Sequence, residues 1–227
     1  MKRKSVGNAT ANGKAGDDQA AIAQQRRKRV PRACDGWGSP ALFDLLQRLV
    51  GKGRDRIKKL LGDLVPSGGR VLDVACGTGE MSSAFTHARY FGVDRQYEYV
   101  TYARRHRRAQ CAVMDATRLA VADGSFATVV AVNALHHFDD ASVRRFVGEA
   151  ARVLSPDGHL AIVDFTPDRN RDLVQKAVIA LDRGRYVRTA DACMRLLDDR
   201  FELCAFSRVP NWPWNYAVFV LAPRGVL

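Results

Sequence analysis

The sequence predicts an α/β fold in which a mostly parallel β-sheet is covered by helices on both faces. Two observations lead to this prediction. Short, continuously apolar runs recur between residues 70 and 165, and segments with helical spacing of apolar residues lie between them. Strands of this kind are typical of parallel sheets, because both faces of each strand are buried. A chain of 227 residues suffices for one such core, so we expect a single domain over residues 35–227.

The predicted elements follow one another in a regular order. Residues 39–64 have apolar side chains at helical spacing, and Ser39 and Pro40 favour a helix start. Strands are predicted at 70–76, 90–94, 110–116, 126–135 and 158–165, and helical segments between them at about 80–88, 96–106 and 140–153. A helix at 189–200 precedes two further strands, 201–209 and 214–222, which are joined by a short turn containing proline. We therefore expect seven strands, with the last one antiparallel.

The net charge of +12 is concentrated at the beginning of the chain. Residues 1–34 hold nine Lys or Arg and two Asp, and few large apolar side chains. Such a segment buries too little surface to offset the entropy of ordering, so we predict a disordered basic arm. Its densest part, "QQRRKRVPR" at 24–32, either contacts nucleic acid or anionic lipid, or is a solubilising tail with no partner.

Composition also argues against several classes of protein. No run approaches the roughly 20 apolar residues that span a bilayer, and no apolar segment of a secretory signal follows the first charges. The five cysteines have no CxxC spacing, which is typical of reduced thiols. We therefore expect a cytoplasmic protein without a metal site.

The stretch "VLDVACGTGE" at 71–80 ends a predicted strand in a glycine-bearing turn, where open parallel sheets bind ligands. It lacks the GxxxxGK[ST] pattern of an ATP- or GTP-binding loop. It also departs from the dinucleotide pattern GxGxxG, because Ser82 stands at the third glycine position. Acids at Asp73 and Glu80 would repel phosphates and would suit an ammonium or sulfonium group instead.

Two further acids end the next strands. Asp94 ends the second strand, where nucleotide-binding α/β proteins place a carboxylate that accepts hydrogen bonds from ribose hydroxyls. Asp115 ends the third strand, where a carboxylate can accept from the exocyclic amine of adenine. A nucleoside with a cationic tail therefore fits the sequence better than a nucleotide does.

These motifs resemble those of the class I S-adenosylmethionine-dependent methyltransferases, in the subset typified by the enzymes of ubiquinone and menaquinone biosynthesis. The resemblance covers about residues 38 to 222, and five motifs stand in the family's order: "VLDVACGTGE", "GVD", "MDA" with "LAVADGSFATVV", "VNALHHF", and "EAARVLSPDGHLAIVDF". Ala120, Ala127 and Asp157 depart from the family pattern, at turn positions rather than ligand contacts. The resemblance implies a Rossmann-like sheet, and S-adenosylmethionine as the cofactor with S-adenosylhomocysteine as its product.

The resemblance also implies which residues contact the cofactor. Asp73, Gly77, Asn133 and Leu135 would border its methionine part, and Gly79 and Asp94 its ribose. Asp115, Ala116 and Arg95 would lie at the adenine, although Arg95 also reads as a solvated surface residue. The full set of implied contact positions is Asp73, Ala75, Gly77, Gly79, Asp94, Arg95, Asp115, Ala116, Asn133 and Leu135.

The chemistry implied is an in-line displacement, in which the protein aligns the two partners and excludes water. If the acceptor is a phenol or an acidic carbon, a base assists, and His136 and His137 follow the fourth strand at the mouth of the site. The sequence does not distinguish the two histidines, and both can be read as wall residues. Cys76, in the glycine turn, reads as small-residue packing rather than a nucleophile.

Acceptor choice is expected in the least family-like segments. Residues 166–188 combine an apolar helical face with several Arg and Lys, and we interpret them as a lid, with an ordinary packed helix as the alternative. "NWPWNY" at 211–216 either stacks on bases or covers a sheet edge. We expect a small or lipid-like acceptor. The alternatives are an RNA or protein methyltransferase that uses the basic arm, and a catalytically inactive S-adenosylmethionine-binding protein.

Overall fold

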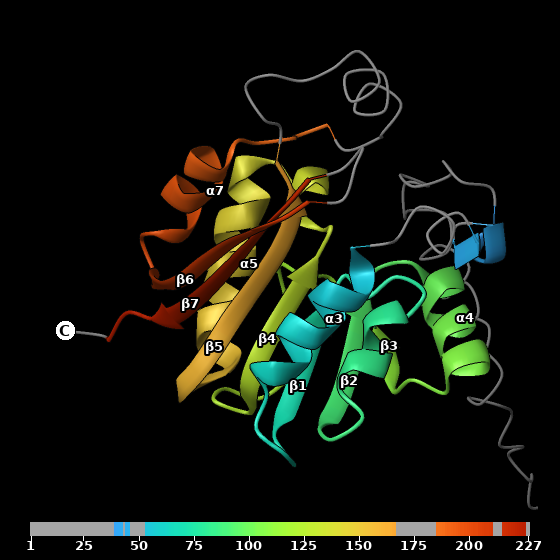
Figure 1. Cartoon of the computed structure of the whole chain (residues 1–227). Coiled ribbons are helices and arrows are strands. Elements are labelled where there is room, and N and C mark those ends of the chain that lie inside the picture. The colour runs from blue at the N-terminus through green and yellow to red at the C-terminus, as the bar shows by residue number, and fades with distance from the viewer. Residues whose placement is uncertain (1–38, 43, 46–52, 167–184, 211–214, 226–227) are drawn as a thin grey trace, which may run out of the picture. The chain divides into compact units, whose positions relative to one another are not determined.

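The computed structural model describes residues 39–42, 44–45, 53–166, 185–210 and 215–225. The chain divides into two units, Met1–Gly36 and Trp37–Leu227, and all described residues lie in the second. That unit contains one seven-stranded sheet in the order β3-β2-β1-β4-β5-β7-β6 (Figure 1). The strands are β1 Arg70–Val74, β2 Arg89–Asp94, β3 Cys111–Val113, β4 Phe126–Val132, β5 Leu154–Phe165, β6 Phe201–Val209 and β7 Tyr216–Pro223.

The first five strands run parallel to one another, and β7 lies antiparallel to both β5 and β6. This confirms the predicted mixed sheet with an antiparallel last strand. Because β1 lies between β2 and β4, the chain reverses its direction of travel across the sheet at β1. Ligands of such sheets bind beyond the carboxyl ends of the strands at this reversal.

Helices cover both faces of the sheet (Figure 1). The helical elements are α3 Arg54–Asp63, η1 Glu80–Ala84, α4 Tyr97–Arg107, η2 Leu135–His137, α5 Asp140–Val153 and α7 Ala190–Leu197. Helices α5 and α7 pack with alternate residues of the strands on one face, and α3 and η1 pack with the intervening strand residues on the other. The Asp139 side chain caps α5 by accepting from the Ser142 amide at 2.7 Å, and Thr189 caps α7 in the same way.

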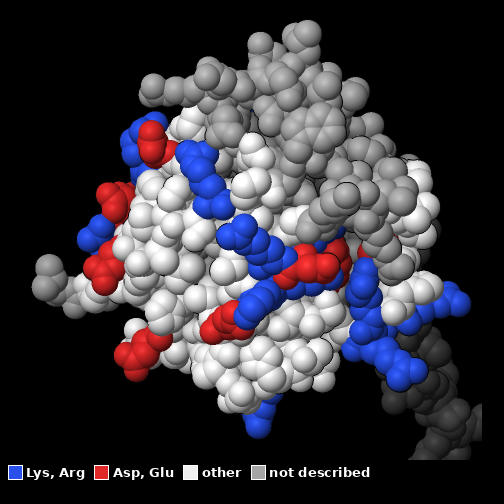
Figure 2. Space-filling model, in the orientation of Figure 1, with Lys and Arg blue, Asp and Glu red and all other residues white. Residues whose placement is uncertain are grey.

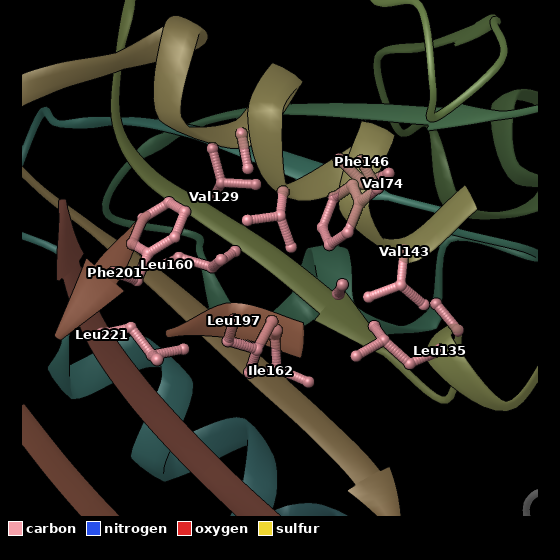
Figure 3. Packing of buried hydrophobic residues seen from close by; sticks show 14 of the residues in the cluster. Val74, Val129, Leu135, Val143, Phe146, Leu160, Ile162, Leu197, Phe201 and Leu221 are labelled. Carbon is pink, nitrogen blue, oxygen red and sulfur yellow. The ribbon is translucent and has the colours of Figure 1, made fainter. Parts of the chain in front are cut away.

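The larger core lies between the sheet and the helices α5 and α7 (Figure 3). Phe146 of α5 and Leu197 of α7 are fully buried there, against Leu160 and Ile162 of β5. Truncating one such side chain to alanine costs about 2–5 kcal/mol, because it removes apolar contacts and leaves a cavity. This packing fixes β4 and β5, whose carboxyl ends carry part of the site.

The structure corrects several predicted boundaries. The segment predicted as one helix over 39–64 contains helical residues at 40–42 and 44–45 and the helix α3, which begins after a turn at Gly53. The segment at 80–88 is helical only as the short 3₁₀ element η1, in which the Ser82 and Ser83 hydroxyls donate to the carbonyls of Gly79 and Glu80. Side-chain bonds of this kind compete with α-helical ones, which explains the short element.

Two strands also differ from their predicted extent. Strand β3 ends at Val113, and the following residues turn because Asp115 accepts hydrogen bonds from Thr117. Strand β5 begins at Leu154 rather than at residue 158, so it follows α5 directly. Most of the predicted lid at 166–188, most of the segment 211–216 and the basic arm at 1–34 lie outside the described residues.

Candidate cofactor and active site

The site is organised by Asp94, the last residue of β2. Its Oδ2 accepts a hydrogen bond from the Gly77 amide at 2.9 Å, and its Oδ1 accepts from the Gln96 amide at 2.8 Å. The side chain is buried, and burial raises the pKa of Asp94 while the amide hydrogen bonds lower it. The carboxylate therefore ties the glycine turn after β1 to the tip of β2, and a carboxylate oxygen can accept more than one hydrogen bond.

The glycine turn has the backbone conformation that its sequence anticipates. Ala75, Gly77 and Gly79 have φ values of 60°, 53° and 72°, in the left-handed region that favours glycine. A Cβ on Gly77 would meet nothing within 4 Å, so this residue presents open backbone. A Cβ on Gly79 would lie 2.9 Å from the Ala103 Cβ, so Gly79 is required for contact with α4. The two glycines thus differ in role, one facing open space and the other packing on a helix.

Asp73 is completely buried in β1 and has an internal partner. The Tyr90 hydroxyl donates to its Oδ2 at 2.7 Å. Burial raises the pKa of Asp73 to about 7, and the hydrogen bond from Tyr90 opposes this rise. Near neutral pH both the neutral and the charged form of this carboxyl group are therefore populated.

Glu80 was expected to be available to a cationic ligand, but its side chain is paired within the protein. Its Oε2 lies 2.5 Å from Nη1 of Arg54, and its Oε1 lies 3.5 Å from Nζ of Lys58. The charge of Glu80 is thus balanced by α3. Sequence reasoning missed Arg54, because its contact depends on how α3 packs over the loop.

The residues expected to lie at the adenine follow the ends of β2 and β3. Asp115 is exposed, and its Oδ1 accepts from the amide and the hydroxyl of Thr117, both at 2.8 Å. Ala116 is half-buried and packs against the larger core, and Arg95 is exposed. Asp94 therefore ends β2, as the sequence predicts, whereas Asp115 lies in the turn that follows the end of β3 at Val113.

Asn133 follows β4 with φ 53°, a conformation that asparagine tolerates better than most residues. Its side chain hydrogen-bonds Tyr216, the first residue of β7. Its Oδ1 is buried and has no hydrogen-bond partner among the described residues. Leu135 is fully buried in the core.

The structure separates the two histidines that the sequence could not distinguish. His136 is 5% exposed, and its Nδ1 lies 2.6 Å from Oδ1 of Asp164, whereas His137 is exposed. The Asp164 carboxylate also accepts from the His136 amide at 3.1 Å and from the Phe165 amide at 2.8 Å. Sequence reasoning missed Asp164. Its place near the end of the fifth strand is similar to that of Asp94 at the end of the second, and this position could have marked it as a candidate site residue.

Arg188 fixes the backbone of η2. Its guanidinium donates to the carbonyls of Leu135 at 3.0 Å and Phe138 at 2.7 Å, and it pairs with Asp140 at 2.6 Å. The Tyr186 amide donates to the carbonyl of His136 at 3.0 Å. The end of the predicted lid segment, at Tyr186 and Arg188, is therefore attached to the histidine turn.

The described residues contain no group of three or more His, Cys, Asp or Glu side chains placed to hold a metal ion. Within the same residues, every helix is too short or too polar to span a membrane.

Comparison with known proteins identifies the domain. Residues 71–158 match the family described as "Methyltransferase domain". Residues 71–158 thus form a methyltransferase domain of the class I S-adenosylmethionine-dependent type.

Relatives and solved structures agree with this assignment. The chain is 31% identical over 137 residues to a ubiquinone/menaquinone biosynthesis C-methyltransferase of Desulfotalea psychrophila, covering 55% of this chain and 54% of the relative. It is also 31% identical to the demethylmenaquinone methyltransferase of Thermus thermophilus, covering 55% and 61%. The chain thus spans little more than half the length of these curated relatives. A crystal structure of a methyltransferase of this type from Methanosarcina mazei matches the fold, with a TM-score of 0.62, 20% identity and coverage of 72% and 96%.

Proposed function

We propose that the protein transfers a methyl group from S-adenosylmethionine to a small or lipid-like acceptor. The observation that carries the proposal is the Asp94 carboxylate, which holds the open backbone of Gly77 at the reversal point of the sheet. The residues present fit this cofactor. Gly77 leaves room against the backbone, Asp94 offers acceptors to the ribose hydroxyls, and the unpartnered Oδ1 of Asn133 is an acceptor for the methionine ammonium.

When bound, the cofactor supplies an activated methyl group, so the protein's task is to align the acceptor and exclude water. We propose that Asp94 and Asp115 hold the adenosine part. The loop at Gly77 and the tip of β4 at Asn133 would hold the methionine part.

We further propose that His136, rather than His137, removes the acceptor's proton. Its Nδ1 lies against the Asp164 carboxylate, which favours the tautomer with a proton on Nδ1 and the lone pair on Nε2. The Asp164 carboxylate also stabilises the imidazolium that forms when Nε2 takes up a proton. The exposed ring of His137 lies 4.1 Å from the His136 ring, at an angle of 46°, and would form part of the wall.

The surroundings of His136 support an apolar acceptor. The Phe165 ring lies 4.5 Å from the His136 ring, and the partly exposed Tyr186 is hydrogen-bonded to the same turn through its backbone. The two named relatives act, by their names, in ubiquinone or menaquinone biosynthesis, which favours a quinone-like acceptor for this chain as well.

The charge distribution bears on the RNA alternative. In Figure 2, Lys and Arg side chains are interspersed with Asp and Glu across the middle of the visible face. An RNA-binding surface typically presents a clustered basic stripe. The mixed charges of this face therefore favour a small acceptor.

The test uses labelled S-adenosylmethionine and fractionated cell extract. We expect label in small metabolites or lipid, lost in His136→Gln and retained in the matched variant His137→Gln. Label confined to RNA or protein would refute the acceptor class. A bound cofactor with no labelled product in any fraction would refute the activity and support a binding protein.

A further inference from the structure

Two cysteine side chains meet over Gly92 on one face of β2. A Cβ added to Gly92 would lie 2.8 Å from the Sγ of Cys76 and 3.1 Å from the Sγ of Cys111. Both distances are shorter than a Cβ normally keeps from another atom, so the two sulfur atoms flank the space that a side chain at this position would fill. The meeting of the two thiols therefore depends on the glycine between them.

The two cysteines come from opposite sides of β2. Cys76 belongs to the glycine turn after β1, and Cys111 begins β3. Both are free thiols, 9% and 3% exposed, and they belong to one small cluster with Val100 and Ala103 of α4. The fold thus brings the thiol of the cofactor turn to a second thiol that is 35 positions further along the chain.

The two thiols differ in acidity because one donates a hydrogen bond to the other. This bond lowers the pKa of Cys111, and the charge of Arg104 acts in the same direction, against burial. The same bond raises the pKa of Cys76, and burial adds to that rise. Cys111 is therefore the sulfur that loses its proton first, and the thiolate is the form of cysteine that reacts with oxidants.

We propose that Cys76 and Cys111 are a modification site, at which hydrogen peroxide produces an intramolecular disulfide. The Cys111 thiolate attacks one peroxide oxygen and the O–O bond breaks, which leaves a sulfenic acid and a hydroxide that takes up the proton lost by Cys111. The Cys76 sulfur then attacks the Cys111 sulfur, the S–O bond breaks, and the Cys76 proton leaves with the departing hydroxide. Two thiols and one peroxide thus give one disulfide and two waters.

The disulfide would alter the turn that precedes η1. Cys76 stands next to Gly77, whose amide donates to Asp94 at 2.9 Å. A disulfide holds its sulfur atoms about 2.05 Å apart, much closer than two thiols in contact, so Cys76 must move toward Cys111. We therefore expect the oxidised protein to bind the cofactor less tightly. This consequence rests on the proposed function, whereas formation of the disulfide does not.

Peptide mass spectrometry of the full chain tests the disulfide directly. The protein is treated with hydrogen peroxide, its remaining thiols are alkylated, and it is digested with trypsin. Because Cys76 and Cys111 fall in different tryptic peptides, 71–89 and 109–118, the disulfide joins these peptides into one species. We expect this species after oxidation and its loss on treatment with dithiothreitol. Both peptides separately alkylated, or Cys111 oxidised to the sulfinic acid without a linked species, would overturn the proposal.

Substitution of single cysteines checks the pairing. Cys111→Ser should abolish the linked species. The matched control is Cys204→Ser, which removes an exposed cysteine of β6 and should leave the rate of linkage unchanged within about twofold. A linked species that joins Cys76 to another cysteine would show that the pairing is wrong. If Cys111→Ser does not fold, the peptide map of the unaltered protein still decides.

Calorimetric titration with S-adenosylhomocysteine then measures the effect on the turn. The oxidised protein should bind about 5- to 150-fold more weakly than the reduced protein, the range of coupling between linked sites, and dithiothreitol should restore the affinity. By the same linkage, saturating S-adenosylhomocysteine should oppose the disulfide.

The failures of the two proposals differ. An unchanged affinity of the linked protein would refute the effect on the turn and leave the disulfide standing. A reduced protein that does not bind S-adenosylhomocysteine would refute the proposed function, while the peptide map alone would decide the disulfide.

Discussion

Asp73→Asn should stabilise the protein above neutral pH, and the gain should shrink as the pH falls. The carboxyl group is buried in β1, and burial raises its pKa from 3.8 to about 7. Between about pH 4 and pH 7 the native state keeps a proton that the unfolded state has released. Wild-type stability therefore falls as the pH rises through this window and levels off above it. Asparagine keeps an acceptor for the Tyr90 hydroxyl and has no charge to bury.

The magnitude follows from the change in pKa. A rise of the pKa from 3.8 to about 7 destabilises the native wild-type protein by about 4 kcal/mol at pH 8. At pH 5 the same calculation gives a destabilisation of about 2 kcal/mol. The advantage of the variant should thus be about 2 kcal/mol larger at pH 8 than at pH 5.

Urea unfolding of both proteins at pH 5, 6, 7 and 8 measures this difference, with unchanged m values showing that the two unfolding reactions are comparable. Asp157→Asn is the control, because Asp157 is exposed and its removal should leave the pH profile unaltered. The reasoning would be refuted if the free energy of unfolding of the wild-type protein rose, relative to that of Asp73→Asn, as the pH increases.

Four further substitutions test the site. Gly79→Ala should destabilise the protein by about 1–3 kcal/mol, because its Cβ would lie 2.9 Å from that of Ala103 and its φ is 72°. Gly77→Ala should cost only the backbone penalty of about 1 kcal/mol, because its Cβ would meet nothing within 4 Å. Equal melting temperatures of the two variants would contradict this difference. Asp94→Ala should weaken S-adenosylhomocysteine binding by about 1–3 kcal/mol, and an unchanged affinity in calorimetry would remove the ribose assignment. Asp164→Asn should leave that affinity within about twofold and reduce the labelled product; weakened cofactor binding instead would assign Asp164 to the cofactor pocket.

Much of the fold was predictable because its signals are local in sequence. Continuously apolar strands indicated a parallel sheet, and the acids at Asp94 and Asp115 marked the carboxyl ends of β2 and β3. Predicted boundaries were wrong where side chains bond the backbone. The hydroxyls of Ser82 and Ser83 shorten the helical segment after β1, and periodicity does not register such bonds.

The sequence predicted which strand ends carry the candidate site residues, but it did not predict how their side chains pair. Glu80 was expected to face a ligand, yet α3 neutralises it with Arg54 and Lys58. His136 and His137 were equivalent in sequence, and the structure distinguishes them by the burial of His136 and its contact with Asp164. These contacts join residues 22 to 28 positions apart in the chain, and no spacing rule for a helix or a strand connects them.

By itself, the sequence determined the order of the elements, the sheet they form and the strand ends at which acids stand. Those features follow from which residues prefer to be buried and from the alternation of apolar runs, and both are written along the chain. The tertiary structure decided which charges are balanced, which carboxyl group is protonated near neutral pH and which buried atoms lack a partner. These properties depend on distance and on exclusion of water, which arise only when α3 and the strands of the sheet are packed together.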